Sequence, residues 1–438
     1  MHLVPQKLTS WLEKRLHLLP IVHNGIWLLS ERGARLAFGL LVSAWVARYL
    51  GPSQFGELAY VLAFMAIFQG IANLGLDGIV VREIAQKKSA VGIILGTTFA
   101  LRSLAAILCW IIAVVSVGLT KGFASESFTL TALIGGGLLF QSSDTVDLWF
   151  QSQSQSRRTV LAKFSAYVIA NAIRVAMILM DAPLIAFALV IGLEAFLNAC
   201  GLYIAYRLYP CGQFWTSSIK KSKELLLESW PYILSTLSII LYMRIDQIMI
   251  KAYLGDDQLG IYAAILPLAT LWQFLPMTIM VSLGPLVASK KLEGDRAYLK
   301  LLYQIFRLYA LLGWASCALV FIFSGYLIPL LYGEQYLKGV GVIKIYVLTN
   351  IFINMGVAQS LWLINERKPI ISMYKTLSGA ISCVIGNILL LPMYGIQGAA
   401  WVAVISMGVS AVFSNLIFDK KIFFMQMRSL ILILNKNV

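Results

Sequence analysis

The sequence predicts an all-α integral membrane protein with twelve transmembrane helices in two six-helix bundles, related by a parallel pseudo-two-fold axis. Of its 438 residues, 59% are apolar and only 13% are charged, whereas a soluble domain carries about 25% charged residues. Runs of about 20 mostly apolar residues recur along the chain, which is the length an α-helix needs to cross a membrane. A short motif also occurs twice, which indicates an internal repeat. Transmembrane β-barrels show ten-residue alternating segments instead, so the long runs exclude that class.

The apolar runs define the individual helices. We place them at 22–47, 56–81, 91–118, 128–150, 160–180, 183–206, 230–253, 259–288, 301–327, 339–364, 370–392 and 396–418. Before the first of them, residues 7–19 combine an apolar stripe at helical spacing with basic neighbours. This pattern predicts an interfacial helix that lies on the membrane surface.

Lysine and arginine are distributed unevenly between the loops. The N-terminus, every second loop and the C-terminal tail hold 22 of the 35, whereas the intervening loops hold four, Arg48, Lys121, Lys251 and Lys338. Cytoplasmic loops carry the excess of basic residues, so both termini are predicted in the cytoplasm. Topology therefore explains most of the net charge of +15, and nucleic-acid binding is not expected.

The repeated motif divides the chain into halves. Residues 49–56, YLGPSQFG, match residues 253–260, YLGDDQLG, at an offset of 204. Six helices separate the two copies, and this even number gives both halves the same orientation in the membrane. We expect a six-helix bundle over 1–206, a cytoplasmic linker at 207–229, a second bundle over 230–418 and a basic cytoplasmic tail at 419–438.

Several kinds of chemistry are not indicated. The five cysteines are odd in number and form no C-x-x-C, and the three histidines all lie near the N-terminus. No disulfide framework, metal site or cofactor is therefore predicted. The chain also lacks the glycine-rich phosphate-binding motif of nucleotide-driven pumps.

Charged residues occur within the predicted helices, where each costs at least about 2.5 kcal/mol near the bilayer centre. The basic ones are Arg32, Arg35, Arg102, Lys163, Arg174, Arg244, Arg307, Lys344 and Lys375. The acidic ones are Glu31, Asp77, Asp144, Asp147, Glu194 and Asp246. Such residues face a bundle interior or a watery cavity, so together they predict a hydrated and mildly cationic central path.

Simpler interpretations compete at each position. Lys163 and Lys375 lie near cytoplasmic helix ends, and we interpret them as anchors that reach the membrane surface. Arg32 and Arg35 share a helix face, but Glu31 and Arg35 can also form an ion pair four residues apart.

Two further pairs of charged residues leave alternatives open. Arg244 and Asp246 are two residues apart and cannot both point squarely into one cavity, so we assign Arg244 to the path. Asp144 and Asp147 share a face near a cytoplasmic helix end, where they form either a gate or solvated helix-end carboxylates.

Three stretches carry a family resemblance. They are RYLGPSQFG at 48–56, GLDGIVVRE at 75–83, and SWP at 229–231 followed by YMRIDQIMI at 242–250. The sequence resembles bacterial Wzx-type flippases of O-antigen and other polysaccharides. These belong to the MOP (multidrug/oligosaccharidyl-lipid/polysaccharide) exporter superfamily, together with the lipid II flippase and MATE multidrug exporters.

The resemblance implies transport, not catalysis, in the bacterial inner membrane. The implied cargo is an undecaprenyl-pyrophosphate-linked oligosaccharide, moved from the cytoplasmic to the periplasmic leaflet by alternating access. A polysaccharide polymerase and glycosyltransferases of the same pathway are implied as partners.

The implied cargo is anionic, which gives the helix charges a role. Arginine binds phosphate oxygens two at a time, so Arg32, Arg35, Arg174 and Arg244 are the candidate pyrophosphate ligands, with Arg102 and Lys344 as further candidates. The acidic residues Glu31, Asp77, Asp144, Asp147 and Asp246 are candidates for ion coupling or gating.

Two other functions remain open. A MATE-like exporter of organic cations would need an acidic cavity, whereas basic residues outnumber acidic ones in these helices. A membrane polysaccharide polymerase or lipid-sugar transferase usually needs a large hydrophilic loop, and the longest loop here has only about 20 residues.

Overall fold

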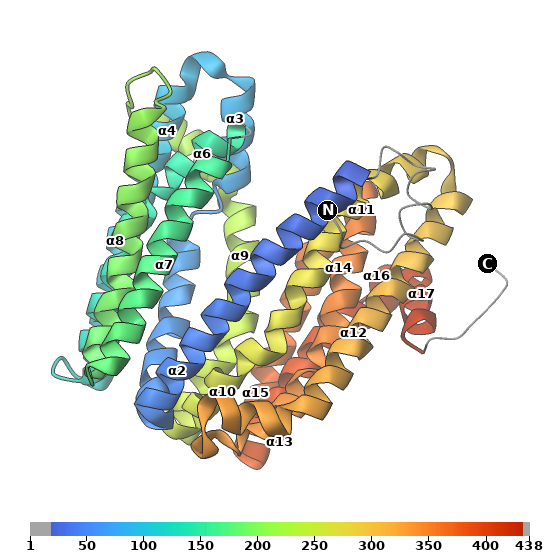
Figure 1. Cartoon of the computed structure of the whole chain (residues 1–438). Helices are drawn as coiled ribbons and strands as arrows, with labels where there is room; N and C mark the ends of the chain where they lie inside the picture. Colours follow the sequence, from blue (N-terminus) through green and yellow to red (C-terminus); the bar gives the residue numbers. More distant parts are fainter. Residues whose placement is uncertain (1–18, 154, 432–438) are drawn as a thin grey trace.

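The computed structural model of the chain describes residues 19–153 and 155–431, and their side chains over 36–153, 155–368 and 370–431. All regular elements in this part of the chain are helical, as predicted. We call residues 19–208 the N-terminal lobe and residues 219–431 the C-terminal lobe. Helices α3–α8 gather on one side of the molecule and α10–α17 on the other, with α2 and α9 running between them (Figure 1).

The helix bounds are as follows. The N-terminal lobe contains α2 (Leu19–Ala72), α3 (Asp77–Gln86), α4 (Val91–Lys121), α5 (Glu126–Gln141), α6 (Asp144–Ser152), α7 (Arg157–Leu179) and α8 (Leu184–Leu208). The C-terminal lobe contains α9 (Ile219–Leu254), α10 (Asp256–Thr270), α11 (Phe274–Leu292), α12 (Asp295–Tyr332), α13 (Gly339–Tyr346), α14 (Thr349–Asn365), α15 (Pro369–Gly408), α16 (Asn415–Phe418) and α17 (Lys420–Leu430). A π-helical segment, Val409–Phe413, follows α15.

Nine segments of the described chain are long and apolar enough to span a membrane. Two of them, Leu36–Gln86 and Ile370–Phe418, contain 51 and 49 residues. A straight helix of that length would exceed 70 Å, more than twice the thickness of the hydrocarbon core. Each contains a long helix with one non-helical glycine of positive φ, Gly51 in α2 or Gly395 in α15, where two helices meet at a kink.

Four predicted helices are interrupted, which corrects the sequence prediction. The predicted helices at 56–81, 128–150, 259–288 and 339–364 are broken near residues 73–76, 142–143, 271–273 and 347–348. The predicted linker at 207–229 is also partly helical, because α9 begins at Ile219. The predicted interfacial helix at 7–19 lies outside the described residues except for its last position.

The two copies of the repeated motif contact each other. A Cβ atom added to Gly56 would lie 2.0 Å from the carbonyl oxygen of Asp256, and one added to Gly260 would lie 1.8 Å from that of Pro52. Gly56 corresponds to Gly260, and Pro52 to Asp256, at the same offset of 204. The contact is therefore reciprocal, and glycine is required on both sides because only it lets the backbones approach so closely.

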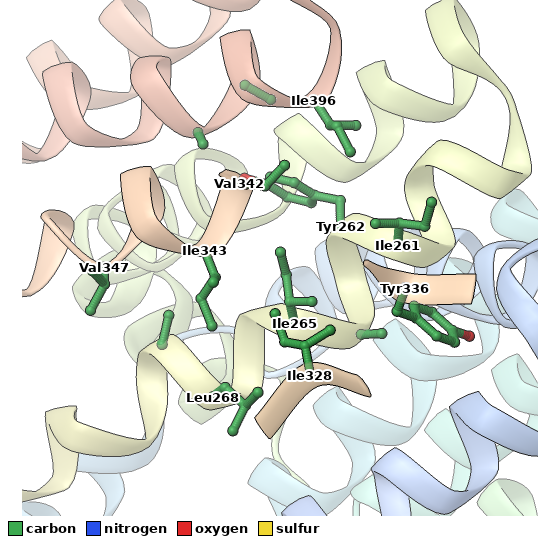
Figure 2. Close-up of a cluster of buried hydrophobic side chains, with 14 of the residues drawn as sticks. Ile261, Tyr262, Ile265, Leu268, Ile328, Tyr336, Val342, Ile343, Val347 and Ile396 are labelled. Carbon is green, nitrogen blue, oxygen red and sulfur yellow. The ribbon is translucent and has the colours of Figure 1, made fainter. Parts of the chain in front are cut away.

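A buried apolar cluster lies next to this contact in the C-terminal lobe. Ile261, Tyr262 and Ile265 of α10 face Val342 and Ile343 of α13 (Figure 2). Tyr336, between α12 and α13, donates a hydrogen bond of 2.7 Å to the carbonyl of Ala47 in α2. The lobes are thus joined by packing and by a buried hydrogen bond at this end.

Helix α9 belongs to both lobes. Near its start, Lys221 forms an ion pair with Glu83 of α3 at 2.5 Å, and Glu228 pairs with Arg82 of the same helix. Its later turns pack against α15 and α10 of the C-terminal lobe. These turns also contact α2 of the N-terminal lobe, and Pro231 lies inside the helix.

Candidate functional site

A cavity of about 310 Å³ lies between α2, α7 and α8 of the N-terminal lobe. Arg174 of α7 lines it, together with the buried amide of Asn171. The guanidinium donates to Glu194 of α8 at 2.6 Å and to Asn171 at 3.1 Å. Of the predicted pyrophosphate ligands, Arg174 therefore has a cavity in front of it, but its charge is already paired with a carboxylate.

A second cavity, of about 200 Å³, adjoins the first, since Leu62 and Ile191 line both. Its polar lining includes Asp144. Asp144 and Asp147 both form ion pairs with Lys163 of α7, at 2.7 and 3.0 Å. The predicted acidic gate is therefore a three-residue ion-pair cluster between α6 and α7, and the lysine predicted as a free anchor belongs to it.

Arg102 fixes the interruption between α2 and α3. Its side chain is only 2% exposed, and it donates to Asp77 at 2.5 Å and to Asn73 at 2.8 Å. Asn73 also donates to Asp77 at 2.9 Å, which closes a triangle across the break. This geometry favours a structural role for Arg102 and Asp77 over contact with a substrate.

Among the described cations predicted within membrane helices, Arg244 differs from Arg102, Arg174 and Lys375 because it is exposed and makes no hydrogen bond or ion pair with a described residue. Two residues away, Asp246 is buried and accepts a hydrogen bond of 2.6 Å from Tyr262. The two side chains therefore have different environments, one open and one closed, in keeping with their separation of about 200° around a helix.

The position of Arg244 is defined by its neighbours on the same face of α9. One turn before it, Ile240 contacts Gly70 of α2. Two turns after it, Lys251 forms an ion pair with Glu57 of α2. Residues 240, 244 and 251 follow helical spacing, so Arg244 lies on the face of α9 that contacts α2 before and after it.

Lys344 lies elsewhere. Its ammonium is 5.9 Å from the ring centre of Phe321 in α12, and the ring belongs to an exposed apolar side chain. Lys344 is therefore not brought together with Arg174 or Arg244. Glu31, Arg32 and Arg35 lie in the helical part of α2, but their side chains are outside the described residues.

Sequence reasoning missed two polar clusters. Lys251 is buried and forms ion pairs with Glu57 and Asp256, the latter at 2.8 Å, and its ammonium lies 4.4 Å from the ring centre of Tyr60. The sequence prediction places Lys251 in a loop. Its position just before the repeated motif is the pattern that could have identified this cluster, because the two copies of the motif meet at the junction of the lobes.

The second missed cluster surrounds Lys375, which is 5% exposed and is not the surface-reaching anchor we predicted. Its ammonium donates to Gln359, to Asn415 at 2.9 Å and to the carbonyl of Ala411 at 3.3 Å. Gln426 of α17 completes the cluster through Asn415. Among the described residues no carboxylate pairs with Lys375, so neutral groups alone hold this buried amine.

This lysine also borders a cavity. A space of about 320 Å³ lies between α9, α11, α14 and α15, and Lys375, Gln359 and Tyr242 are among its lining residues. The carbonyl of Ala411 lies in the π-helical segment, and it accepts hydrogen bonds from Asn415 and Gln426 as well. The irregular turn thus supplies an acceptor that an unbroken α-helix would have used internally.

Comparison with known proteins agrees with this architecture. A protein family described as polysaccharide biosynthesis protein matches residues 21–291, more than half of the chain. No curated protein sequence matches.

Solved structures of transporters match over most of their length. An inward-facing MATE multidrug transporter of the MOP superfamily is 14% identical, with a TM-score of 0.72, over 90% of this chain and 96% of that one. The lipid II flippase MurJ, in an inward closed conformation, is 14% identical with a TM-score of 0.69, over 92% and 91%. An outward-facing MATE transporter is 13% identical with a TM-score of 0.58, over 90% and 94%. At these identities the likeness establishes a common fold.

Proposed function

The chain belongs to the polysaccharide biosynthesis protein family, and on that premise we propose that it is a flippase for a lipid-linked oligosaccharide. The proposed cargo is an undecaprenyl-pyrophosphate-linked repeat unit of O-antigen or a similar polysaccharide. It moves from the cytoplasmic to the periplasmic leaflet of a bacterial inner membrane. Glycosyltransferases that build the unit and a polymerase that consumes it are the proposed partners.

The proposed topology has twelve crossings, with both termini in the cytoplasm. The kinks at Gly51 and Gly395 divide two long segments into four crossings, and α5 with α6 adds one that is too interrupted to count among the nine. The helix breaks then fall in the second and fourth crossing of each half. Together with the reciprocal contact of Gly56 and Gly260, this recurrence supports a parallel pseudo-two-fold axis.

Arg244 is the observation that carries the proposal. A pyrophosphate cannot cross hydrocarbon without a cationic partner, because the cost of moving an unpaired charge out of water is prohibitive. An exposed arginine without a carboxylate partner, on a helix face that points at the opposite lobe, is available to bind it. Arg32 and Arg35 are proposed to extend this path, with Arg174 contributing once an anion competes with Glu194.

The arrangement of the lobes supports alternating access from an inward-facing state. The chain superposes better on the inward-facing than on the outward-facing transporter, with TM-scores of 0.72 and 0.58. The end where Gly56 meets Gly260 is closed by backbone packing, and Lys251 and Glu57 form a buried ion pair beside it. This is the proposed periplasmic end, which would have to open for release of the cargo.

The membrane potential suits this direction of transport. With the cell interior negative, outward movement of a charge near −2 is favoured by about 2.3 kcal/mol per charge per 100 mV. The proposed flippase therefore needs no nucleotide. Proton or sodium coupling through Glu31, Asp77 or Asp246 stays a second possibility within the same proposal.

The test uses single substitutions in a strain that depends on this protein. Arg32→Ala, Arg35→Ala and Arg244→Ala should each reduce surface polysaccharide at equal protein level, with Arg244→Lys retaining part of the output. Lys344→Ala is the matched control, since it removes a membrane cation beside Phe321 and should leave output unchanged. Wild-type output from all three arginine variants would reject the cationic path. Resistance to organic cations on overexpression would instead favour the exporter function.

A further inference from the structure

A cavity of about 990 Å³ lies at the start of α12, between that helix and α17, and is larger than the cavities within the lobes described above. Four cations line it: Arg296 and Lys300 from α12, and Lys421 and Arg428 from α17. All four are exposed, and none makes a hydrogen bond or ion pair with another described residue. The cavity is therefore ringed by cations whose charge nothing in the described chain neutralises.

Two carboxylates also line this cavity, and both are already paired. Glu293 pairs with Lys290 at 2.5 Å, and Asp295 pairs with Lys291 at 3.0 Å. Because these lysines come from the end of α11, each carboxylate is engaged by a neighbour. The four cations of the cavity thus keep their charge for another anion.

One buried polar group faces the same space. Tyr303 of α12 lines the cavity and is 8% exposed, and its hydroxyl has no hydrogen-bond partner in the described structure. It follows Lys300 by three residues and Arg296 by seven, which places all three on one face of α12. A buried hydroxyl without a partner is destabilising, and an acceptor bound in the cavity would satisfy it.

The surface of α17 that faces the cavity is amphipathic, and contacts on the other side of the helix fix its position. Lys421, Phe424, Met425 and Arg428 follow helical spacing and line the cavity, with apolar side chains between the two cations. The opposite face is buried, and Gln426 from that face reaches the cluster around Lys375. Trp314 of α12 also donates to the carbonyl of Leu430 at 3.1 Å. The cavity is therefore a fixed feature of the lobe.

We propose that this cavity binds the phosphate headgroup of an anionic phospholipid from the cytoplasmic leaflet. Basic pockets beside membrane helices on the cytoplasmic side suit such headgroups. The exposed ring of Phe424 and the exposed side chains of Leu308 and Leu311, one to two turns further along α12, offer a surface for acyl chains. A soluble phosphate compound would leave this apolar surface in water. The inference rests on the proposed membrane orientation, but it needs no flippase activity.

The experiment measures lipid binding to the full-length protein in nanodiscs and in detergent. The probe is phosphatidylglycerol or cardiolipin in a phosphatidylcholine background, with bound lipid counted by native mass spectrometry. A variant with Arg296→Ala, Lys300→Ala, Lys421→Ala and Arg428→Ala should bind the anionic lipid at least about tenfold more weakly, because it removes the four cations that would attract the phosphate. Tyr303→Phe should weaken binding less, without loss of charge.

The matched control removes four unpaired cations from another surface of predicted cytoplasmic loops and helix ends: Lys88→Ala, Arg157→Ala, Lys220→Ala and Lys223→Ala. It lowers the net charge equally and should retain lipid binding. Equal loss in both quadruple variants, or unchanged binding in the first, would overturn the site. Displacement of the lipid by inorganic phosphate would overturn the choice of a lipid as the ligand. Because Arg244→Ala should retain lipid binding, this result stands or falls separately from transport.

Discussion

In the N-terminal lobe, three cations within predicted membrane helices each form an ion pair with a carboxylate. Arg102 pairs with Asp77, Arg174 pairs with Glu194, and Lys163 pairs with both Asp144 and Asp147. In the C-terminal lobe, Lys375 is held by neutral amides and a carbonyl, and Arg244 has no such partner among the described residues. Among the described residues, the first lobe thus pairs these three cations with carboxylates, whereas the second holds a lysine and an arginine that have no carboxylate partner.

The largest expected effect comes from breaking a pair in the N-terminal lobe. Arg174→Met leaves Glu194 as a lone carboxylate, and removal of one partner of a buried pair costs about 3–5 kcal/mol. The side chains are 20% and 30% exposed, so we expect a loss of about 2 kcal/mol in the free energy of unfolding, measured in denaturant. Adding Glu194→Gln should recover most of this stability. A double variant as unstable as the single one would contradict the pairing.

Lys375→Met should cost less, although Lys375 is the more deeply buried. The substitution strands no opposite charge, and it leaves only neutral acceptors, whose loss of a donor costs about 1–3 kcal/mol. We expect about 1 kcal/mol, because the amides of Gln359 and Asn415 can still bond to each other. The same denaturant titration checks this value. A loss larger than that of Arg174→Met would mean that the lobes do not differ as described.

Asp77→Asn should have a smaller effect. Asp77 is 56% exposed, so water solvates its carboxylate and screens part of its attraction to the buried Arg102. Arg102 also keeps its bond to Asn73. We expect a loss of at most about 1 kcal/mol and a small fall in the thermal midpoint, with Asn73→Ala as the comparison for the neutral bond.

Asp144→Asn should have the smallest effect of the four. Lys163 retains its ion pair with Asp147, and Asp147 stays fixed by the hydroxyl of Thr159. We expect less than about 0.5 kcal/mol, read as an unchanged thermal midpoint. The double variant with Asp147→Asn strands the lysine and should be clearly less stable. Additive single effects would show that the two carboxylates act independently.

Much of the fold could be predicted from the sequence, because lipid-facing helices must be apolar along their whole length. The kink at Gly51 and the turn at Gly255 fall within the repeated motif, so the sequence also predicts a change of helix at these two positions. The breaks near 142–143 and 347–348 were not, since the apolar composition continues through them. Hydrophobicity indicates which residues lie in lipid, but it does not indicate whether the helix that they form is continuous.

The candidate site was harder to predict, because the partners of a charge are distant in sequence. Lys375 lies near a helix end, which suggested a snorkelling anchor, but α17 folds back and covers it with Gln426. No local sequence pattern predicts that α17 covers Lys375. The spacing of Arg244 and Asp246 predicts that their side chains point apart, and the first is exposed while the second is buried. The assignment of Arg244 to a cationic path stays a prediction.

Helix α9 has a mechanical consequence. Its first turns are tied to α3 by two ion pairs, and later turns contact α2 of the N-terminal lobe as well as α15 of the C-terminal lobe. Because α9 contacts both lobes along its length, rocking of one lobe against the other would have to bend this helix or break one set of these contacts. Pro231 removes one backbone hydrogen bond near the end that is tied to α3. Bending would therefore be easiest at this turn, and the stiffness of the turn would limit how far the lobes can part.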